Sequence, residues 1–147
     1  MRIAIGADHG GFKLKEILKK FLRKKGHQVK DFGTYSEESY DYPIVGSELS
    51  KAVGRKTFTR GILICKTGVG MSIVANKIRG VRAALCDRID IARSSRMHND
   101  ANVLILAANI VSAAKAKRIV GIWLSTPALR GRHRRRVSQI SEIEKLI

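Results

Sequence analysis

The sequence predicts an α/β fold, a doubly wound, five-stranded parallel sheet with helices on both faces. Short apolar runs alternate with segments of helical periodicity along the whole chain. The apolar runs are continuous instead of alternating with polar residues, which is typical of parallel strands that helices cover on both faces. No internal repeat or low-complexity linker breaks this pattern, so we expect residues 1–147 to form one domain.

The first half of the chain predicts three strands and two helices. Residues 12–25 have apolar side chains near helical spacing with lysines between them, and Gly26 ends the pattern. A polar, turn-rich stretch at 33–43 separates the second strand from the second helix. The expected elements are, in order, strand 3–5, helix 12–25, strand 29–32, helix 44–53 and strand 61–65.

The second half continues the alternation. The expected elements are helix 71–78, strand 81–86, helix 89–97, strand 103–107, helix 112–124 and a final helix within 132–146 that is basic at its start. In such sheets ligands bind outside the carboxyl ends of the strands. We therefore expect a site near Asp8, His9 and residues 65–70. Residues 98–102 lie between a helix and a strand, so only the three-dimensional fold could bring them near that site.

Composition limits the class of protein. The chain is 44% hydrophobic, and no apolar stretch approaches the roughly 20 residues that span a bilayer. Residues 1–6 are too short and too strand-like for a secretory signal. Cys65 and Cys86 do not make a disulfide framework. These features favour a cytoplasmic protein with reduced thiols and no membrane partner.

The formal charge of +17 is the unusual feature of the composition. Clustered lysine and arginine attract phosphate from any source, including nucleic acid. Here the charge is spread along the chain, and only residues 130–136 form a dense basic run. The aromatic content of 5% is low for a surface that stacks on single-stranded bases. We therefore do not expect nucleic acid to be the main partner.

The glycine-containing loop after Cys65 has several interpretations. A Walker-type loop requires a Gly-Lys-Ser/Thr string, and a dinucleotide fingerprint requires a third small residue; the sequence lacks both. A backbone anion cradle fits better, because Gly68 and Gly70 let successive amides point at one oxygen and the following helix adds its positive end. The same field would lower the pKa of Cys65, and Thr67 would add a hydroxyl. The residues alone leave this interpretation open against a simple structural turn.

Other polar clusters also have two interpretations each. Asp8 is suited to capping the helix that follows it, and the Asn and Asp residues within 98–102 are suited to a turn. A turn explains His98 less well, since an imidazole moves protons near neutral pH. Arg132 and Arg136 are four residues apart, so on a helix they share a face that can grip a phosphate.

The remaining candidates favour structural interpretations. Cys86 ends an apolar run and is expected to be buried, and Arg134 and Arg135 are expected to be solvated. The four histidines and two cysteines show no metal-ligand spacing, so the sequence predicts no metal site.

Taken together, these residue clusters resemble the type B ribose-5-phosphate isomerase family, which also includes allose- and galactose-6-phosphate isomerases. The similarity runs over nearly the whole chain, through residues 3–12, 31–36, 41–43, 61–76, 98–103 and 131–137. Several blocks in the same order are more specific than any single motif. The resemblance implies the sheet predicted above and a homodimer, often paired into a tetramer, with active sites shared between subunits and the C-terminal helix at the dimer interface.

The resemblance also implies a reaction, the reversible conversion of an aldose phosphate into its ketose through an enediolate, without a metal or an organic cofactor. Cys65 would move the proton between C2 and C1. His98 would open the furanose ring as acid and base, with Asp8 and Thr67 nearby.

The other residues carried over from the resemblance would bind the phosphorylated sugar. The developing oxyanion would be stabilised by the loop amides, those of Lys66, Thr67, Gly68, Val69 and Gly70. The phosphate would be held by His9, Arg132 and Arg136, and the sugar hydroxyls or ring by Asn99 and Tyr42.

The sequence departs from the family's pattern at three positions. Lys66 replaces a glycine between the cysteine and the threonine, where it either restricts the loop or adds a cation near the enediolate. Asn109 stands where the family usually carries an arginine, which removes a phosphate or hydroxyl contact. Arg130 replaces a glycine ahead of Gly131.

Two alternatives to a ribose 5-phosphate isomerase stay open. One is a six-carbon sugar-phosphate isomerase, because Asn109 would leave room for another carbon. The other is a catalytically weakened relative that acts as a binding protein, with the basic surface docking nucleic acid or an acidic partner.

Overall fold

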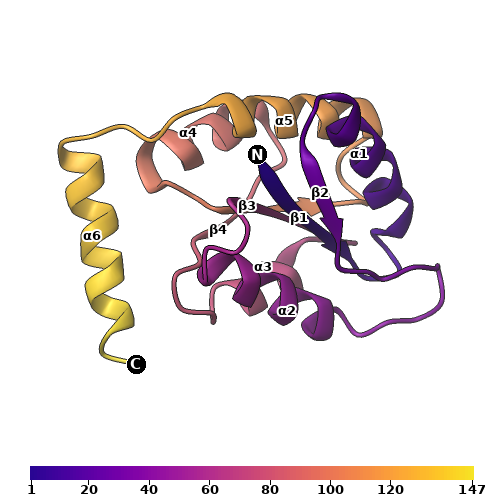
Figure 1. Ribbon diagram of the computed structural model, residues 1–147, viewed down its shortest axis with the longest axis horizontal. Coiled ribbons are helices and arrows are strands. Elements are labelled where there is room, and N and C mark those ends of the chain that lie inside the picture. The colour runs from indigo at the N-terminus through magenta and orange to yellow at the C-terminus, as the bar shows by residue number, and fades with distance from the viewer.

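The computed structural model describes residues 1–147 and contains the predicted sheet (Figure 1). Its five strands are all parallel and lie in the order β2-β1-β3-β5-β4. The strands are β1 (Arg2–Ala7), β2 (Gln28–Asp31), β3 (Arg60–Cys65), β4 (Ala83–Leu85) and β5 (Val103–Ala107). The helices are α1 (Phe12–Lys24), α2 (Tyr42–Gly54), α3 (Val69–Ala75), α4 (Ile89–Asn99), α5 (Ala113–Ser125) and α6 (Arg132–Glu144).

Helices cover both faces of the sheet, as the alternation of elements predicts. In Figure 1, α1, α4 and α5 lie above the sheet and α2 and α3 lie below it. Each strand contributes side chains to both faces of the sheet, because successive side chains of a strand point in opposite directions. In β3, Ile62 and Ile64 pack into the core beneath α1 and α5, whereas Leu63 and Cys65 pack against α2 and α3.

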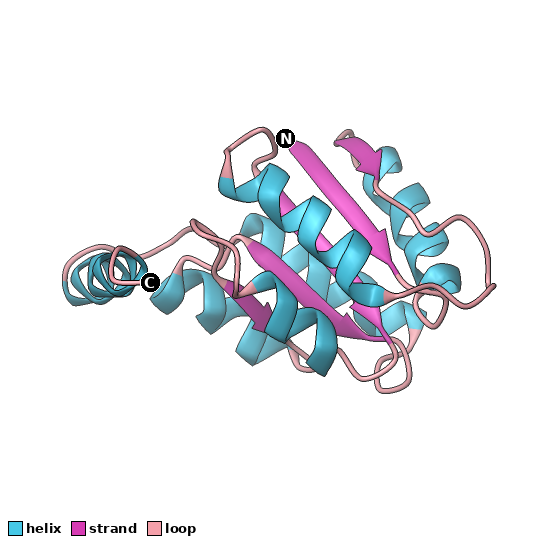
Figure 2. Cartoon of the chain, turned by 90° about the horizontal axis from the view of Figure 1, so that it is seen from below, coloured by secondary structure: helices cyan, strands magenta, loops and turns pink.

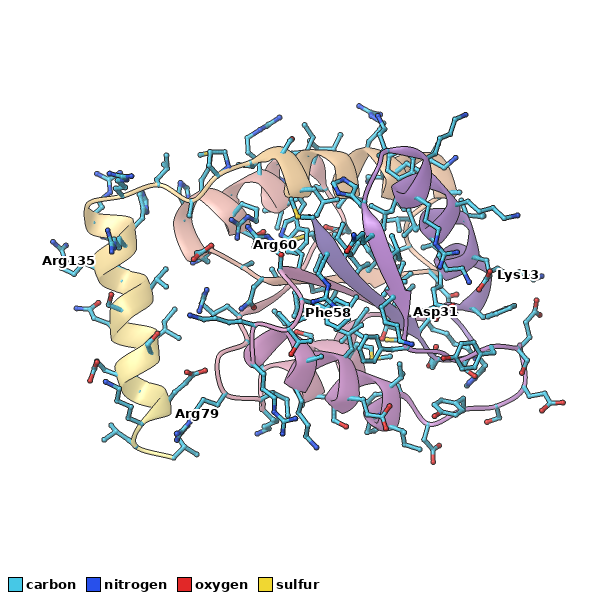
Figure 3. The ribbon with its side chains drawn as sticks, in the orientation of Figure 1. Lys13, Asp31, Phe58, Arg60, Arg79 and Arg135 are labelled. Atoms are coloured by element: carbon cyan, nitrogen blue, oxygen red, sulfur yellow. The ribbon has the colours of Figure 1, made fainter.

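The helix α6 stands apart from this body. Figure 2 shows it nearly end-on, beside the layered part of the chain. None of its side chains is buried. It is tied to the body near Arg79 (Figure 3), where the Gly80 amide donates to the Glu144 carboxylate at 2.9 Å. No helix of the structure combines the length and the apolar character needed to cross a membrane.

The predicted elements are all present, but several of their boundaries differ. The strand β1 extends beyond residue 5 because Gly6 and Ala7 continue its pairing with β3. The helix α2 begins two residues earlier than predicted, with Pro43 in its first turn, where a missing N–H costs nothing.

The largest corrections concern α3, β4 and α4. The helix α3 begins at Val69 and ends at Ala75, because Gly68 takes a φ of +77° and starts the helix directly. The strand β4 is shorter than predicted, since it pairs with β5 over only Ala83–Leu85. The helix α4 continues to Asn99, so His98 lies in its last turn and not in a loop after it.

Candidate functional site

The thiol of Cys65 lies at the carboxyl end of β3, at the start of the glycine-containing loop. It is buried, and the Gly68 amide donates a hydrogen bond to its Sγ at 3.2 Å. This geometry requires glycine at position 68, because its φ is +77° and a Cβ would lie 2.4 Å from Leu85 Cδ1. The turn at Gly68 therefore directs a backbone N–H at the Cys65 sulfur.

Asp8 and His9 follow the neighbouring strand β1 at the same edge of the sheet. The Asp8 carboxylate is buried and accepts the amides of Gly10 at 2.9 Å and Gly11 at 3.2 Å, so it holds the turn before α1 and does not cap the helix, whose N-cap is Gly11. Nδ1 of His9 lies 3.1 Å from the Tyr40 amide and 3.3 Å from the Tyr40 carbonyl, so Nε2 is the ring nitrogen available to a ligand. Because this contact uses a backbone amide, no side-chain pattern marks Tyr40 in the sequence.

Three further predicted residues close around the same loop. A Cβ added to Gly70 would lie 2.7 Å from the Tyr42 ring, so Tyr42 covers the start of α3. The side chain of Lys66 lies against Gly10, and the Lys66 carbonyl accepts the Asn109 amide at 3.0 Å. We call this group the thiol half-site; its members are Asp8, His9, Tyr42, Cys65, Lys66, Thr67, Gly68, Val69, Gly70 and Asn109.

His98 belongs to a second group of residues, at the start of α6 and the end of α4. Its ring stacks on that of His133, with centroids 4.4 Å apart and an interplanar angle of 12°. Burial lowers the pKa of His133, and the charges of His98, Arg132 and Arg136 act in the same direction. We call this group the histidine half-site; its members are His98, Asn99, Arg132, His133 and Arg136.

Arginine and aspartate side chains hold the end of α4 in place. The guanidinium of Arg96, itself buried, donates to Asp100 at 2.7 Å and to the Ala101 carbonyl at 2.7 Å. Asn102 accepts the Arg82 amide at 2.8 Å and donates to the Gly80 carbonyl at 2.8 Å. The turn chemistry expected of Asp100 and Asn102 is therefore confirmed, and it leaves His98 and Asn99 exposed.

The arginines of the histidine half-site have no acidic partner. Arg132 and Arg136 are both exposed and take part in no ion pair of the structure. A cavity of about 190 Å³ lies beside His98, and two other arginines, Arg130 and Arg134, line it. Its lining residues are Met97, His98, Asp100, Ala128, Leu129, Arg130, Arg134 and Val137. This region therefore offers several unneutralised cations to an anion.

The two half-sites lie at opposite edges of the sheet within one chain. Val103 is the first residue of β5, which follows α4, and it pairs with Gly61 near the start of β3. Cys65 is the last residue of β3, at the opposite end of that strand. With about 3.3 Å per residue, four residues of β3 place roughly 13 Å between the edges. The chain does not bring His98 to Cys65 by itself.

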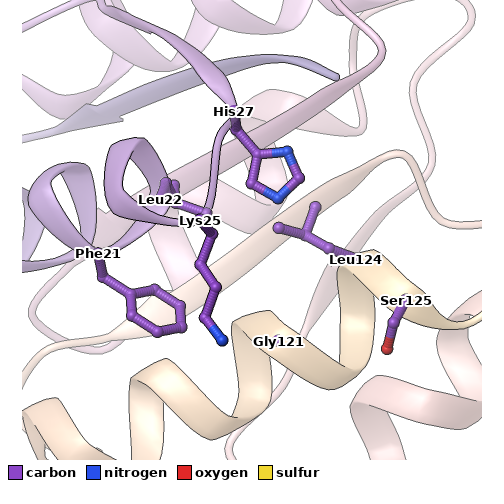
Figure 4. A pocket seen from close by; sticks show the side chains of 7 residues that line it. All are labelled: Phe21, Leu22, Lys25, His27, Gly121, Leu124 and Ser125. Carbon is purple, nitrogen blue, oxygen red and sulfur yellow. The ribbon is translucent and has the colours of Figure 1, made fainter.

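Other features of the structure contribute nothing to either half-site. Cys86 is fully buried, as predicted, and burial raises the pKa of its thiol to about 11. No three His, Cys, Asp or Glu side chains come together as a metal-ligand set. Two larger cavities, of about 320 and 540 Å³, lie on the α1–α5 face, where Phe21 and Lys25 project toward Gly121 (Figure 4).

Comparisons with known proteins identify relatives over nearly the whole chain. Residues 3–140 match the family model described as Ribose/Galactose Isomerase. The chain is 45% identical to the ribose-5-phosphate isomerase B of Escherichia coli over 144 residues, which cover 98% of this chain and 97% of that protein.

Solved structures agree with this relationship. The Clostridium thermocellum ribose-5-phosphate isomerase B superposes with a TM-score of 0.97 at 50% identity, covering 99% of this chain and 98% of the other. The Mycoplasma genitalium ribose-5-phosphate isomerase B, solved with bound ribulose 5-phosphate, superposes with a TM-score of 0.94 at 38% identity, covering 98% and 96%.

Proposed function

The chain belongs to the ribose/galactose isomerase family, and on that premise we propose that it interconverts ribose 5-phosphate and ribulose 5-phosphate. The observation that carries this proposal is the Cys65 thiol, hydrogen-bonded by the Gly68 amide at 3.2 Å, in a chain similar over its whole length to ribose-5-phosphate isomerases. Both cysteines are free, which suits a reduced cytoplasmic setting.

In the proposed reaction Cys65 acts as the base. Its thiolate removes the proton from C2 of the open-chain aldose, and the electrons of that C–H bond form the enediolate with negative charge on O1. The thiol then returns the proton to C1, and a proton passes from the O2 hydroxyl to O1, so that C2 becomes the ketose carbonyl and O1 becomes a hydroxyl. The amides of residues 66–70 lie in the loop after Cys65 and would stabilise the enediolate, the kind of preorganised contribution that often dominates such reactions.

The rest of the thiol half-site is proposed to bind the sugar. Asp8 keeps one carboxylate oxygen for the amides of Gly10 and Gly11 and has the other available for a hydroxyl. Thr67 is exposed at the loop and would act with it, while Tyr42 and Asn109 would contact the ring and the sugar hydroxyls. His9 would donate from Nε2 to the phosphate.

The histidine half-site would come from a second copy of the chain. His98 would open the furanose ring as acid and base, Asn99 would contact a hydroxyl, and Arg132 and Arg136 would grip the phosphate with forked hydrogen bonds. The separation of the half-sites within one chain supports this arrangement, because each holds only part of the machinery. The exposure of Val69 (53%) and Ile73 (58%) on α3 supports a subunit contact beside the thiol loop.

The test is to incubate the purified protein with ribose 5-phosphate and follow ketose formation, with allose 6-phosphate and galactose 6-phosphate in parallel. We expect turnover to be fastest with ribose 5-phosphate. Preference for a six-carbon substrate would instead favour the alternative isomerase. Absence of turnover together with salt-dependent retention on DNA would favour the binding protein.

A further inference from the structure

We propose that the side chain of Lys66 binds the phosphate of the sugar substrate, a role that rests on the proposed function and adds a contact to it. Lys66 directly follows Cys65, the proposed base. Its backbone belongs to the loop whose amides are proposed to stabilise the enediolate. The inference concerns its ammonium group, which the backbone role does not use.

The path of the side chain leads away from the loop and toward His9. A Cβ added to Gly10 would lie 2.4 Å from Lys66 Cγ and 3.1 Å from Cε, so the aliphatic chain lies flat on the Gly10 backbone. Nζ is one bond, about 1.5 Å, beyond Cε. The ammonium group is therefore beside the turn that carries His9, the residue expected to donate to the phosphate.

Nothing in the chain neutralises this ammonium group. Lys66 is exposed and takes part in no ion pair, whereas the nearby Lys13 and Lys15 are paired with Glu37 and Asp31. Glycine at position 10 provides the room for this path, because any side chain there would collide with Lys66. A free cation that is held in place by packing of its stem is suited to an anionic group of the substrate.

The backbone at position 66 tolerates the lysine. The residues other than glycine with positive φ are Lys56 and Asp100, so Lys66 is not in the left-handed region. The Asn109 amide donates to the Lys66 carbonyl at 3.0 Å, so positions 66 and 109 are neighbours. We therefore infer that an arginine at position 109 could take over the phosphate contact from Lys66.

The experiment compares Lys66→Met, which keeps the stem on Gly10, with Lys66→Arg and the unaltered protein. Calorimetry with ribose 5-phosphate and competitive inhibition by inorganic phosphate measure binding apart from turnover. We expect Lys66→Met to weaken both by about ten-fold, the loss of one charge-assisted hydrogen bond, with kcat within about two-fold. Lys66→Arg should bind nearly as the unaltered protein does.

The controls separate this proposal from its premise. Lys77→Met, an exposed lysine after α3, should leave all constants unchanged. Unchanged phosphate inhibition in Lys66→Met, or a loss confined to kcat, would overturn the proposal. Failure of Asn109→Arg to restore binding to Lys66→Met would overturn the inferred equivalence of the two positions. If the unaltered protein binds ribose 5-phosphate without converting it, the isomerase function fails, while the binding constants still test Lys66.

Discussion

The two cysteines of the chain illustrate how environment decides the chemistry of a residue. Cys86 is fully buried among apolar side chains, and burial raises the pKa of its thiol to about 11. Cys65 lies at a strand end, where the Gly68 amide donates to its sulfur. The sequence predicts this difference, because Cys65 is followed by the glycine-containing loop and Cys86 is not, and the expected burial of Cys86 is confirmed.

This contrast predicts selective alkylation. At pH 8 about one Cys86 thiol in a thousand would be ionised even if it were accessible, so iodoacetamide should modify Cys65 first. We expect one modified thiol by mass spectrometry, loss of activity in proportion, and protection by ribose 5-phosphate. Cys65→Ser should lower kcat by more than about 10³-fold with unchanged folding, whereas Cys86→Ser should stay active. Inactivation without modification of Cys65 would contradict the assignment of the base.

Individual residues differ in how well the sequence predicts them. Asp8 was suited both to capping and to catalysis, and in the structure it holds the turn before α1 through the amides of Gly10 and Gly11, while the N-cap is Gly11. The contact between Tyr40 and His9 depends on a backbone amide far along the chain, so local patterns do not reveal it. The path of Lys66 over Gly10 likewise requires the pairing of β1 with β3.

At the scale of elements, the turn from β3 into α3 depends on one glycine. Gly68 has a φ of +77°, and a Cβ there would lie 2.4 Å from Leu85 Cδ1. We expect Gly68→Ala to lower the free energy of unfolding by about 1–3 kcal/mol and to lower kcat as the amide moves away from the Cys65 sulfur. Urea unfolding and steady-state kinetics measure the two effects.

A matched control for Gly68→Ala is Gly121→Ala in α5. An added Cβ at Gly121 meets no atom within 4 Å, and its φ is not positive. Alanine in a helix interior should raise the free energy of unfolding by about 0.5–1 kcal/mol and leave kcat unchanged. Equal effects of the two substitutions would contradict the special role of the Gly68 backbone.

A buried ion pair connects β2 with α1. Lys15 is fully buried and donates to both oxygens of Asp31 at 2.7 Å, and Asp31 lies at the end of β2 (Figure 3). Burial works against ionisation of Asp31, but hydrogen bonds from Lys15, Lys19 and the Gly33 amide outweigh it and lower the pKa below its ordinary value of 3.8. The carboxylate therefore stabilises the fold.

The sign of the pH dependence follows from this lowered pKa. A carboxyl that is more acidic in the folded state contributes stability above pH 3.8, and the contribution is lost as the pH falls through the folded pKa. We expect Asp31→Asn to lower the free energy of unfolding by about 3 kcal/mol at pH 7, with the gap to the unaltered protein narrowing below pH 3.8. Urea unfolding at pH 7 and pH 3 measures this. Glu38→Gln, at an exposed position, should show no gap at either pH.

The sequence predicted the elements more reliably than their ends. Continuous apolar runs and helical periodicity identified the strands and helices that pack into the two cores, since both patterns reflect burial. The ends depend on single residues and on tertiary pairing. Gly68 starts α3 early, and β4 is limited by its pairing with β5 alone.

At the scale of the whole molecule, the topology explains what local patterns could not predict. In a parallel α/β sheet, loops after strands lie at the carboxyl edge and loops after helices lie at the amino edge. Cys65 and Asp8 follow strands, and His98 ends a helix, so the chain places them at opposite edges. Local patterns identify each residue as a candidate but do not reveal that the fold separates them.

The proposal that two chains share each site predicts that two inactive variants restore each other. Cys65→Ser removes the base, and His98→Ala removes the proposed ring-opening group from the other half-site. In a mixed dimer one site would lack both groups and the other would keep both. After subunits exchange at random, half of the dimers are mixed, so activity should recover to about one quarter of that of the unaltered protein.

The measurement follows turnover after mixing equal amounts of the two variants, with exchange monitored by co-purification through a tag on one of them. A chain carrying both substitutions is the control, because it cannot complete a site with either single variant. Recovery from the two single variants alone would locate Cys65 and His98 of one site on different chains. If subunits exchange and no activity returns, each chain must bring its own thiol and imidazole together, which would require a rearrangement across roughly 13 Å of sheet.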